Sequence, residues 1–134
     1  MSGAEAFFDT NVVLYLLSAD QTKADRAEEL LVSSGVISVQ VLNEFAAVAS
    51  RKLRMSSPEI REVLAQVRAV CSVQPVSVET HDRALLVAER YGLSTYDSLV
   101  VAAALLADCT TLYSEGMQDG QVIDSQLIIR NPFV

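Results

Sequence analysis

The sequence has few of the residues on which several common kinds of functional site depend. It contains two cysteines, Cys71 and Cys109, and a single histidine, His81. The isolated cysteines indicate neither a disulfide framework nor a zinc site. No glycine-rich phosphate loop is present, and no nucleophile-elbow sequence accompanies His81, which disfavours a nucleophile–histidine–acid triad. These absences leave the carboxylates as the side chains to follow.

Basic residues and long apolar runs are also scarce. The chain has 10 Lys and Arg against 17 Asp and Glu, a net charge of −7. This balance disfavours a general nucleic-acid-coating protein, because Lys and Arg supply most phosphate affinity, but it does not exclude an enzyme acting on nucleic acid. The longest apolar run, Leu99 to Ala107, is far shorter than the roughly 20 residues of a membrane span. With no secretory signal in the sequence, we expect a reduced, cytoplasmic protein.

The 134 residues have the length of one domain, and apolar periodicity predicts alternating strands and helices. Strands are expected at 6–9, 36–38, within 72–78, at 109–114 and at 127–129. Helices are expected over residues 11–17, 39–53 and 94–107. Three further helices are expected to begin at a Thr22–Asp25 capping box, at Ser57 and at a Thr80 cap. Gly35 suits the left-handed position after the second helix. The alternation predicts an α/β fold with a mainly parallel sheet covered on both faces.

Three carboxylates, Asp9, Glu44 and Asp97, each lie at or shortly after a strand-to-helix transition or a helix start. In a parallel sheet such transitions gather on one edge, and Glu115 follows a strand that reaches the same edge. Clustered carboxylates raise one another's pKa unless a cation is bound. All-oxygen ligands without His or Cys favour Mg²⁺ or Mn²⁺, and phosphodiester hydrolysis is the natural reaction class.

Each acidic residue also has a structural explanation. Asp97 can be a member of a capping box at a helix start, and Glu44 can be an ordinary solvent-facing helix residue. Glu115 and Asp119 lie in a glycine-containing loop, where acidic residues are common. Asp9 is harder to explain in this way, because a charge at the end of an apolar strand needs a partner.

Several motifs occur in a specific order and spacing along nearly the whole chain. They are Phe8–Val12, Gln40–Phe45, Tyr96–Ala104, Leu112–Glu115, Gln118–Gln121 and Asn131–Phe133. Through them the chain resembles a PIN domain, and specifically the VapC-type ribonuclease toxins of bacterial toxin–antitoxin pairs. The resemblance implies a three-layer α/β/α domain over residues 1–134 and Mg²⁺-dependent cleavage of RNA. It also implies a homodimer and a cognate antitoxin that blocks the acidic site.

The resemblance also implies roles for individual residues. Asp9 and Asp97 are expected to be the main Mg²⁺ or Mn²⁺ ligands, and Glu44 is expected to complete the site directly or through water. Hydrogen bonds to these carboxylates or to the substrate are expected from Thr10, Asn11 and Ser114. An RNA-facing rim is expected at Arg51, Lys52 and Arg54, which also suit a solvated helix end.

The chain departs from the family pattern at the fourth acidic position. An Asp normally follows Ser-Glu, and here that position is Gly116. Three outcomes are open: Glu115 or Asp119 supplies the missing ligand, one metal ion works with more water ligands, or the protein is weak or inactive while still folded. We hypothesise an attenuated but correctly folded enzyme.

Two other functions fit parts of the sequence. The first is a catalytically inactive PIN-fold module that binds an antitoxin or RNA, which Gly116 favours and the other acidic residues disfavour. The second is a phosphotransfer or phosphatase domain with Asp9 as nucleophile. Such domains generally have a second Asp two residues on, where this chain has Asn11.

Overall fold

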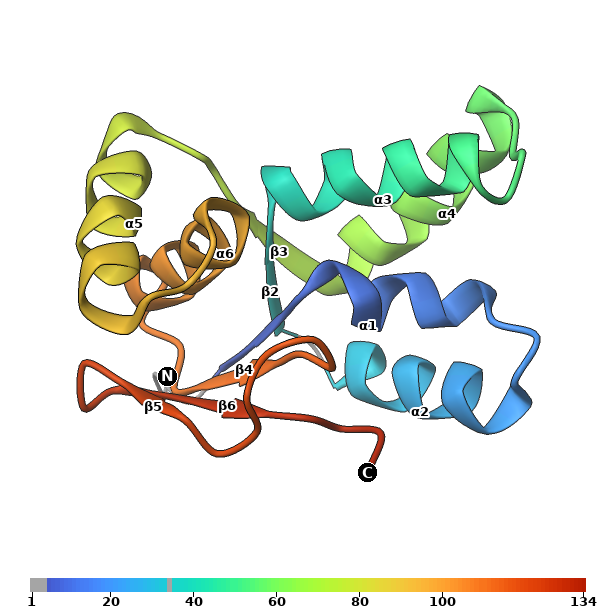
Figure 1. Ribbon diagram of the computed structural model, residues 1–134. Helices are drawn as coiled ribbons and strands as arrows, with labels where there is room; N and C mark the ends of the chain where they lie inside the picture. Colours follow the sequence, from blue (N-terminus) through green and yellow to red (C-terminus); the bar gives the residue numbers. More distant parts are fainter. Residues whose placement is uncertain (1–4, 34) are drawn as a thin grey trace.

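The computed structural model describes residues 5–33 and 35–134 and has helices on both sides of one sheet (Figure 1). The strands are β1 (Ala6–Phe8), β2 (Gly35–Ser38), β3 (Cys71–Gln74), β4 (Thr111–Tyr113), β5 (Val122–Ile123) and β6 (Leu127–Arg130). The helices are α1 (Thr10–Leu14), the 3₁₀ helix η1 (Tyr15–Leu17), α2 (Gln21–Val32), α3 (Val39–Arg51), α4 (Ser57–Val70), α5 (Val78–Tyr91) and α6 (Thr95–Leu106). None of the helices in the described ranges combines the length and hydropathy of a membrane span.

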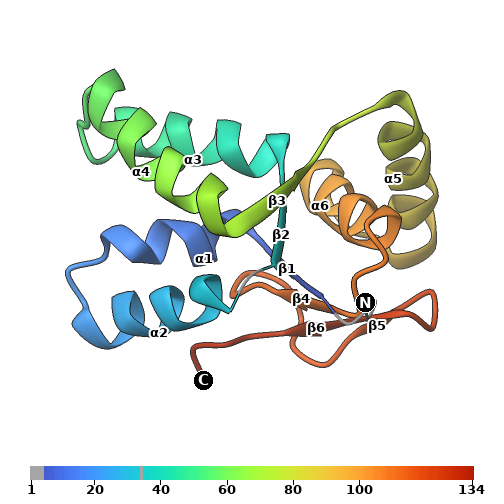
Figure 2. The same cartoon turned by 180° about the vertical axis from the view of Figure 1, so that it is seen from behind.

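The sheet has six strands in the order β3-β2-β1-β4-β6-β5. Every neighbouring pair is parallel except β5 and β6, which are antiparallel. Helices α5 and α6 lie on one side of the sheet and α1 to α4 lie on the other (Figures 1 and 2). This confirms the predicted α/β fold. The two-residue strand β5 was not expected, because a segment so short has no readable periodicity.

The core contains many small apolar side chains. Helix α6 buries all six residues from Val100 to Leu105, which is the pattern of a helix surrounded by other elements. The central strand β1 contributes Phe7 and Phe8, both fully buried. The longest apolar run of the sequence is therefore core, and α6 delivers Asp97 from its exposed first turn.

Two helix starts differ from the prediction. The carboxylate of Asp20 accepts the backbone N–H of Thr22, so Asp20 is the cap of α2 and the predicted Thr22–Asp25 box is wrong. Ser77 caps α5, and Thr80 is the third helical residue of that capping box rather than the cap. In both places the cap lies two or three residues earlier than predicted, so the helix begins earlier and its first free backbone N–H groups are satisfied there.

Gly35 does not end α2 in a left-handed conformation as predicted but begins the buried strand β2. A Cβ at this position would lie 2.5 Å from Cε2 of Phe8 and 2.7 Å from the carbonyl oxygen of Ala6. Glycine is therefore required by the close approach of β2 to β1, the strand that ends at Asp9.

Replacing Gly35 with alanine should lower the free energy of unfolding by about 1–3 kcal/mol, the usual cost of overpacking a core. Urea unfolding measures the effect. Gly116→Ala is the matched control, because its Cβ meets only Nδ2 of Asn11, at 3.8 Å. Equal unfolding midpoints for the two variants would contradict this explanation of Gly35.

Candidate active site

Asp9 is the first residue after β1 and the cap of α1, and it is only 8% exposed. Its Oδ1 accepts the backbone N–H of Thr10 at 2.7 Å, and its Oδ2 accepts the hydroxyl of Ser114 at 2.8 Å. The contact with Ser114 follows from strand register, because Phe8 pairs with Tyr113 in the parallel β1–β4 ladder. Two hydrogen bonds therefore fix the orientation of a buried carboxylate at the carboxyl edge of the sheet.

Glu44 reaches the same place from α3, the helix that follows β2. Its Oε1 accepts the hydroxyl of Thr10 at 2.8 Å. Thr10 therefore contacts both acidic residues, Asp9 through its backbone N–H and Glu44 through its side chain. A half-buried glutamate held in this way is not an ordinary solvent-facing helix residue.

Asp97 lies in the first turn of α6, where its backbone N–H donates to the hydroxyl of Ser94 at 3.2 Å. Its backbone thus has the predicted capping contact. Burial raises the pKa of Asp97, the bond with Ser94 opposes this, and the charge of Glu44 raises the pKa further. The carboxylate is therefore close enough to Glu44 for their charges to interact.

The pKa of Asp9 is likewise raised, chiefly by burial. Hydrogen bonds from Ser114 and Thr10 lower it, while the charges of Asp97 and Glu44 raise it. The structure thus brings Asp9, Glu44 and Asp97 into one electrostatic cluster from distant parts of the chain. We call this group the acidic cluster.

The donor chemistry of the acidic cluster fits a hard cation. Within residues 5–33 and 35–134, no three acidic, histidine or cysteine side chains form a ready-made cage for a metal ion. Mg²⁺ does not need such a cage, because it keeps several waters and is commonly held by one or two carboxylates. The repulsion recorded at Asp9 and Asp97 is what a bound cation relieves. The cluster therefore fits an open Mg²⁺ or Mn²⁺ site.

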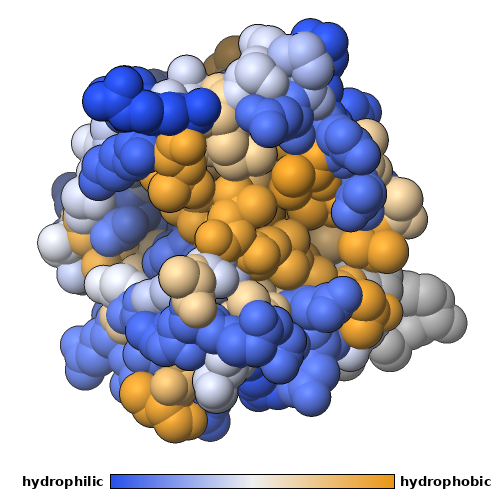
Figure 3. All heavy atoms as spheres, turned by 90° about the vertical axis from the view of Figure 1, so that its right-hand side faces the viewer, coloured by the Kyte–Doolittle hydropathy of each residue, from blue (hydrophilic) through white to orange (hydrophobic). Residues whose placement is uncertain are grey.

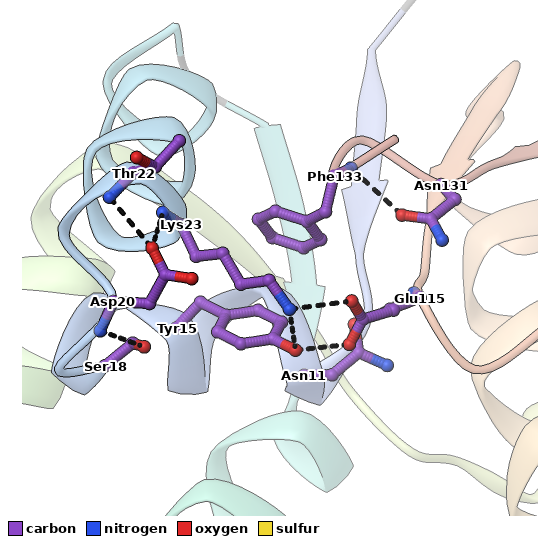
Figure 4. Close-up of polar contacts among 9 residues, drawn as sticks. All are labelled: Asn11, Tyr15, Ser18, Asp20, Thr22, Lys23, Glu115, Asn131 and Phe133. Carbon is purple, nitrogen blue, oxygen red and sulfur yellow. Dashed lines mark hydrogen bonds and ion pairs between the residues drawn. The ribbon is translucent and has the colours of Figure 1, made fainter.

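Glu115 turns its carboxylate toward α2 and η1 (Figure 4). It accepts the hydroxyl of Tyr15, and Lys23 Nζ lies 3.5 Å from its Oε2. Lys23 also donates to the Tyr15 hydroxyl at 3.2 Å and lies 4.7 Å from the centre of that ring. We call these three residues the Glu115 latch. The backbone N–H of Glu115 donates to Oδ1 of Asn11 at 3.1 Å, so Asn11 holds the same turn.

The other predicted site residues lie outside the acidic cluster. The exposed Asp119 accepts the backbone N–H of Asn131 at 2.8 Å and so fastens the chain after β6. Gly116 is exposed and has open space around its Cα. The predicted rim of Arg51, Lys52 and Arg54 is exposed at the far end of α3, about two helical turns from Glu44.

Sequence reasoning missed Tyr15 and Lys23. Tyr15 lies in an apolar run and Lys23 in an amphipathic helix, so each has an ordinary local explanation. Only the tertiary fold brings them to Glu115, which is about 100 residues away in the chain.

A buried aspartate after the first strand, joined by a glutamate and a second aspartate, defines an acidic site at the carboxyl edge of a parallel sheet. A family model of the PIN domain matches residues 6–117 of the chain. The protein belongs to the PIN domain family. No curated protein matches it by sequence.

Solved structures share the fold at low sequence identity. A toxin–antitoxin complex from Klebsiella pneumoniae is 20% identical with a TM-score of 0.71, over 95% of this chain and 97% of that chain. The sarcin-ricin-loop-cleaving toxin VapC20 of Mycobacterium tuberculosis is 21% identical with a TM-score of 0.65, over 81% and 88%. VapBC2 from Rickettsia felis, bound to a promoter DNA fragment, is 19% identical with a TM-score of 0.67, over 94% and 97%. The likeness extends over nearly the full length of these chains.

Asp9→Asn should raise the free energy of unfolding at pH 7 in the absence of divalent ions. The folded-state pKa of Asp9 lies above the ordinary value of 3.8, so the native protein binds more protons than the unfolded one between these two pKa values. Wild-type stability therefore falls as pH rises through that window, and the variant lacks this loss. Urea unfolding in EDTA at pH 4 and pH 7 tests this. An equal destabilisation at both pH values would contradict it.

The Glu115 latch should show energetic coupling between Tyr15 and Glu115. A double-mutant cycle of Tyr15→Phe and Glu115→Gln should give a coupling of about 0.5–1 kcal/mol, because the pair is partly exposed. The matched control combines Tyr15→Phe with Glu62→Gln, an exposed residue of α4, and should give none. Equal coupling in the two cycles would show that the latch contributes nothing specific.

Proposed function

We propose that the protein is a metal-dependent endoribonuclease and the toxin of a toxin–antitoxin pair. The observation that supports this best is the buried Asp9 carboxylate, oriented by Ser114 and Thr10 and joined by Glu44 and Asp97. Such a site has little use as a purely structural feature, since burial and like charges both disfavour ionised Asp9. Membership of the PIN family supports the same function, as does the description of the neighbour VapC20 as a sarcin-ricin-loop-cleaving toxin.

Asp9, Asp97 and Glu44 are the residues that would hold Mg²⁺ or Mn²⁺, which supplies charge neutralisation at a phosphate and an activated water when bound. The chain itself contributes orientation. Ser114 and Thr10 hold Asp9 in one rotamer, and the Thr10 hydroxyl positions Glu44. Hydrogen bonds of this kind around a ligand commonly alter metal affinity by about 10–100-fold.

Gly116 makes this an attenuated enzyme in our proposal. Glu115 is engaged with Lys23 and Tyr15, and Asp119 is engaged with the backbone after β6. Both acidic residues that were considered as replacements for the missing ligand therefore have other partners. Fewer negative charges at the site give weaker binding of a divalent cation.

Gly116→Asp should increase Mg²⁺-dependent RNA cleavage about tenfold or more. Residues that only hydrogen-bond to a metal ligand already change metal affinity or activity by about this factor. The backbone accepts the change, because a Cβ at this position has room. Gly116→Asn is the matched control, of similar shape but without the charge. Adding Asp97→Asn to Gly116→Asp should abolish the gain.

The comparison has two contrary outcomes. Equally strong cleavage by the wild type and Gly116→Asp would contradict attenuation. If neither protein cleaves RNA and calorimetry detects no Mg²⁺ binding, the nuclease function is wrong, and the inactive module that binds an antitoxin or RNA is the better description.

An antitoxin partner is favoured by an apolar surface on helices α1 to α4. The side of the molecule formed by α1 to α4 presents apolar side chains rimmed by hydrophilic ones (Figure 3). On these helices a groove of about 440 Å³ is lined by apolar residues of η1, α2 and α4, among them Leu16, Leu31 and Val67. A toxin–antitoxin complex is among the structural neighbours. We propose that the antitoxin packs into this groove while another part of it blocks the acidic cluster, as the resemblance implies.

The remaining predictions become part of the same proposal. We propose one PIN domain over residues 1–134, acting on cellular RNA in the cytoplasm as a homodimer. Helix α5 offers exposed apolar residues for a dimer face, namely Val78, Leu85 and Leu86. Sedimentation of the purified protein measures the oligomeric state directly.

A further inference from the structure

A hollow of about 430 Å³ lies beside the acidic cluster and includes Glu44 in its wall. Tyr96, the residue before Asp97, lines the same hollow and is 66% exposed. A large aromatic ring in this position buries little apolar surface and so adds little to folding. Its location, one residue from a proposed metal ligand, points to contact with whatever occupies the site.

The surroundings of Tyr96 combine apolar walls with amide groups. Val39 and Val76 line the hollow and are 38% and 43% exposed. Gln40 and Asn43 line it from α3, and Nε2 of Gln40 donates to the backbone carbonyl of Tyr96 at 3.3 Å. This hydrogen bond ties the start of α3 to the start of α6, so the residues that carry the ring and the amides line one hollow.

An aromatic face, apolar walls and amide side chains are the groups by which proteins bind an unstacked nucleobase. The amide of Asn43 offers donors and an acceptor for a base edge, and that of Gln40 retains its acceptor and one donor. An apolar segment of a partner protein would contact the apolar walls but would form no side-chain hydrogen bonds with the amides. The chemistry of the hollow therefore matches a base better than a purely apolar partner.

The charge of the protein strengthens this assignment. With a net charge of −7, the chain offers few basic residues for phosphate contacts with RNA. Stacking on a neutral ring does not depend on basic residues. Base stacking therefore gives a site beside three carboxylates an attraction for RNA that does not depend on basic residues.

We propose that Tyr96 stacks against an unpaired nucleobase next to the cleaved phosphate, while Gln40 and Asn43 face the edge of that base. The inference rests on the proposed ribonuclease function and assigns one base-binding subsite of that same site. Bases of an RNA duplex remain stacked within the helix and cannot enter the hollow.

Tyr96→Trp tests binding without cleavage, because the sequence has no tryptophan and the introduced indole is the sole reporter. In EDTA, a short single-stranded RNA of mixed sequence should quench its fluorescence, and the same RNA annealed to its complement should not. Val122→Trp is the matched control, an exposed position on β5 at the opposite edge of the sheet from β3. It should respond to neither RNA.

Cleavage kinetics in the Gly116→Asp background give the second readout. Tyr96→Ala should raise KM about tenfold, the scale of one base stacked on an aromatic ring, with kcat little changed. Tyr96→Phe keeps the ring and should behave as the parent protein. A merely structural role of Tyr96 would instead lower the unfolding midpoint in both variants.

Three results would overturn the proposal. They are RNA cleavage without any fluorescence response of the Tyr96→Trp variant, equal quenching of that variant by single-stranded and duplex RNA, and a Tyr96→Ala effect confined to the sedimentation of a dimer. Failure of the nuclease function looks different. In that case no variant cleaves RNA while single-stranded RNA still quenches the introduced indole, which supports the base-binding site in a non-catalytic protein.

Discussion

The site depends on one hydrogen-bonded pair, the Asp9 carboxylate and the Ser114 hydroxyl, which join the ends of two neighbouring parallel strands. Their 2.8 Å contact exists because β1 and β4 are in register, and that register depends on the buried Phe7, Phe8 and Leu112. Gly35 lets β2 approach β1 from the other side. Core packing therefore sets the position of the Asp9 carboxylate, whose ionised form burial disfavours.

That position is costly for the fold. A carboxylate whose pKa is raised by burial and by two neighbouring charges weakens the native state at neutral pH. Hydrogen bonds from Ser114 and Thr10 offset part of this cost, and a cation would offset more. The arrangement is typical of a site where stability is reduced in favour of chemistry. In the proposed attenuated enzyme, Gly116 in place of an acidic residue would remove one negative charge near the site and so weaken its attraction for a cation.

The sequence predicted those parts of the fold and site that depend on local pattern. Asp9 was identifiable because an apolar run ends on it, and the apolar helix bearing Asp97 was identifiable from its composition. The start of α2 was mispredicted because Asp20 and Thr22 are both good caps, and only the folded chain decides between them. The engagement of Glu115 with Tyr15 and Lys23 was not predictable, since it joins segments about 100 residues apart with no shared pattern.

The two ends of the acidic cluster have different physical characters. Toward β4, the Glu115 latch and Asn11 form a polar surface built on ion pairs and hydrogen bonds. Toward α3 and β3, Tyr96 and two valines form an apolar surface with amides at its edge. Under the proposed function, an RNA strand lying across the cluster would have its phosphate beside the carboxylates and one base against the Tyr96 ring. The stacking contact would then be the one that selects an unpaired nucleotide.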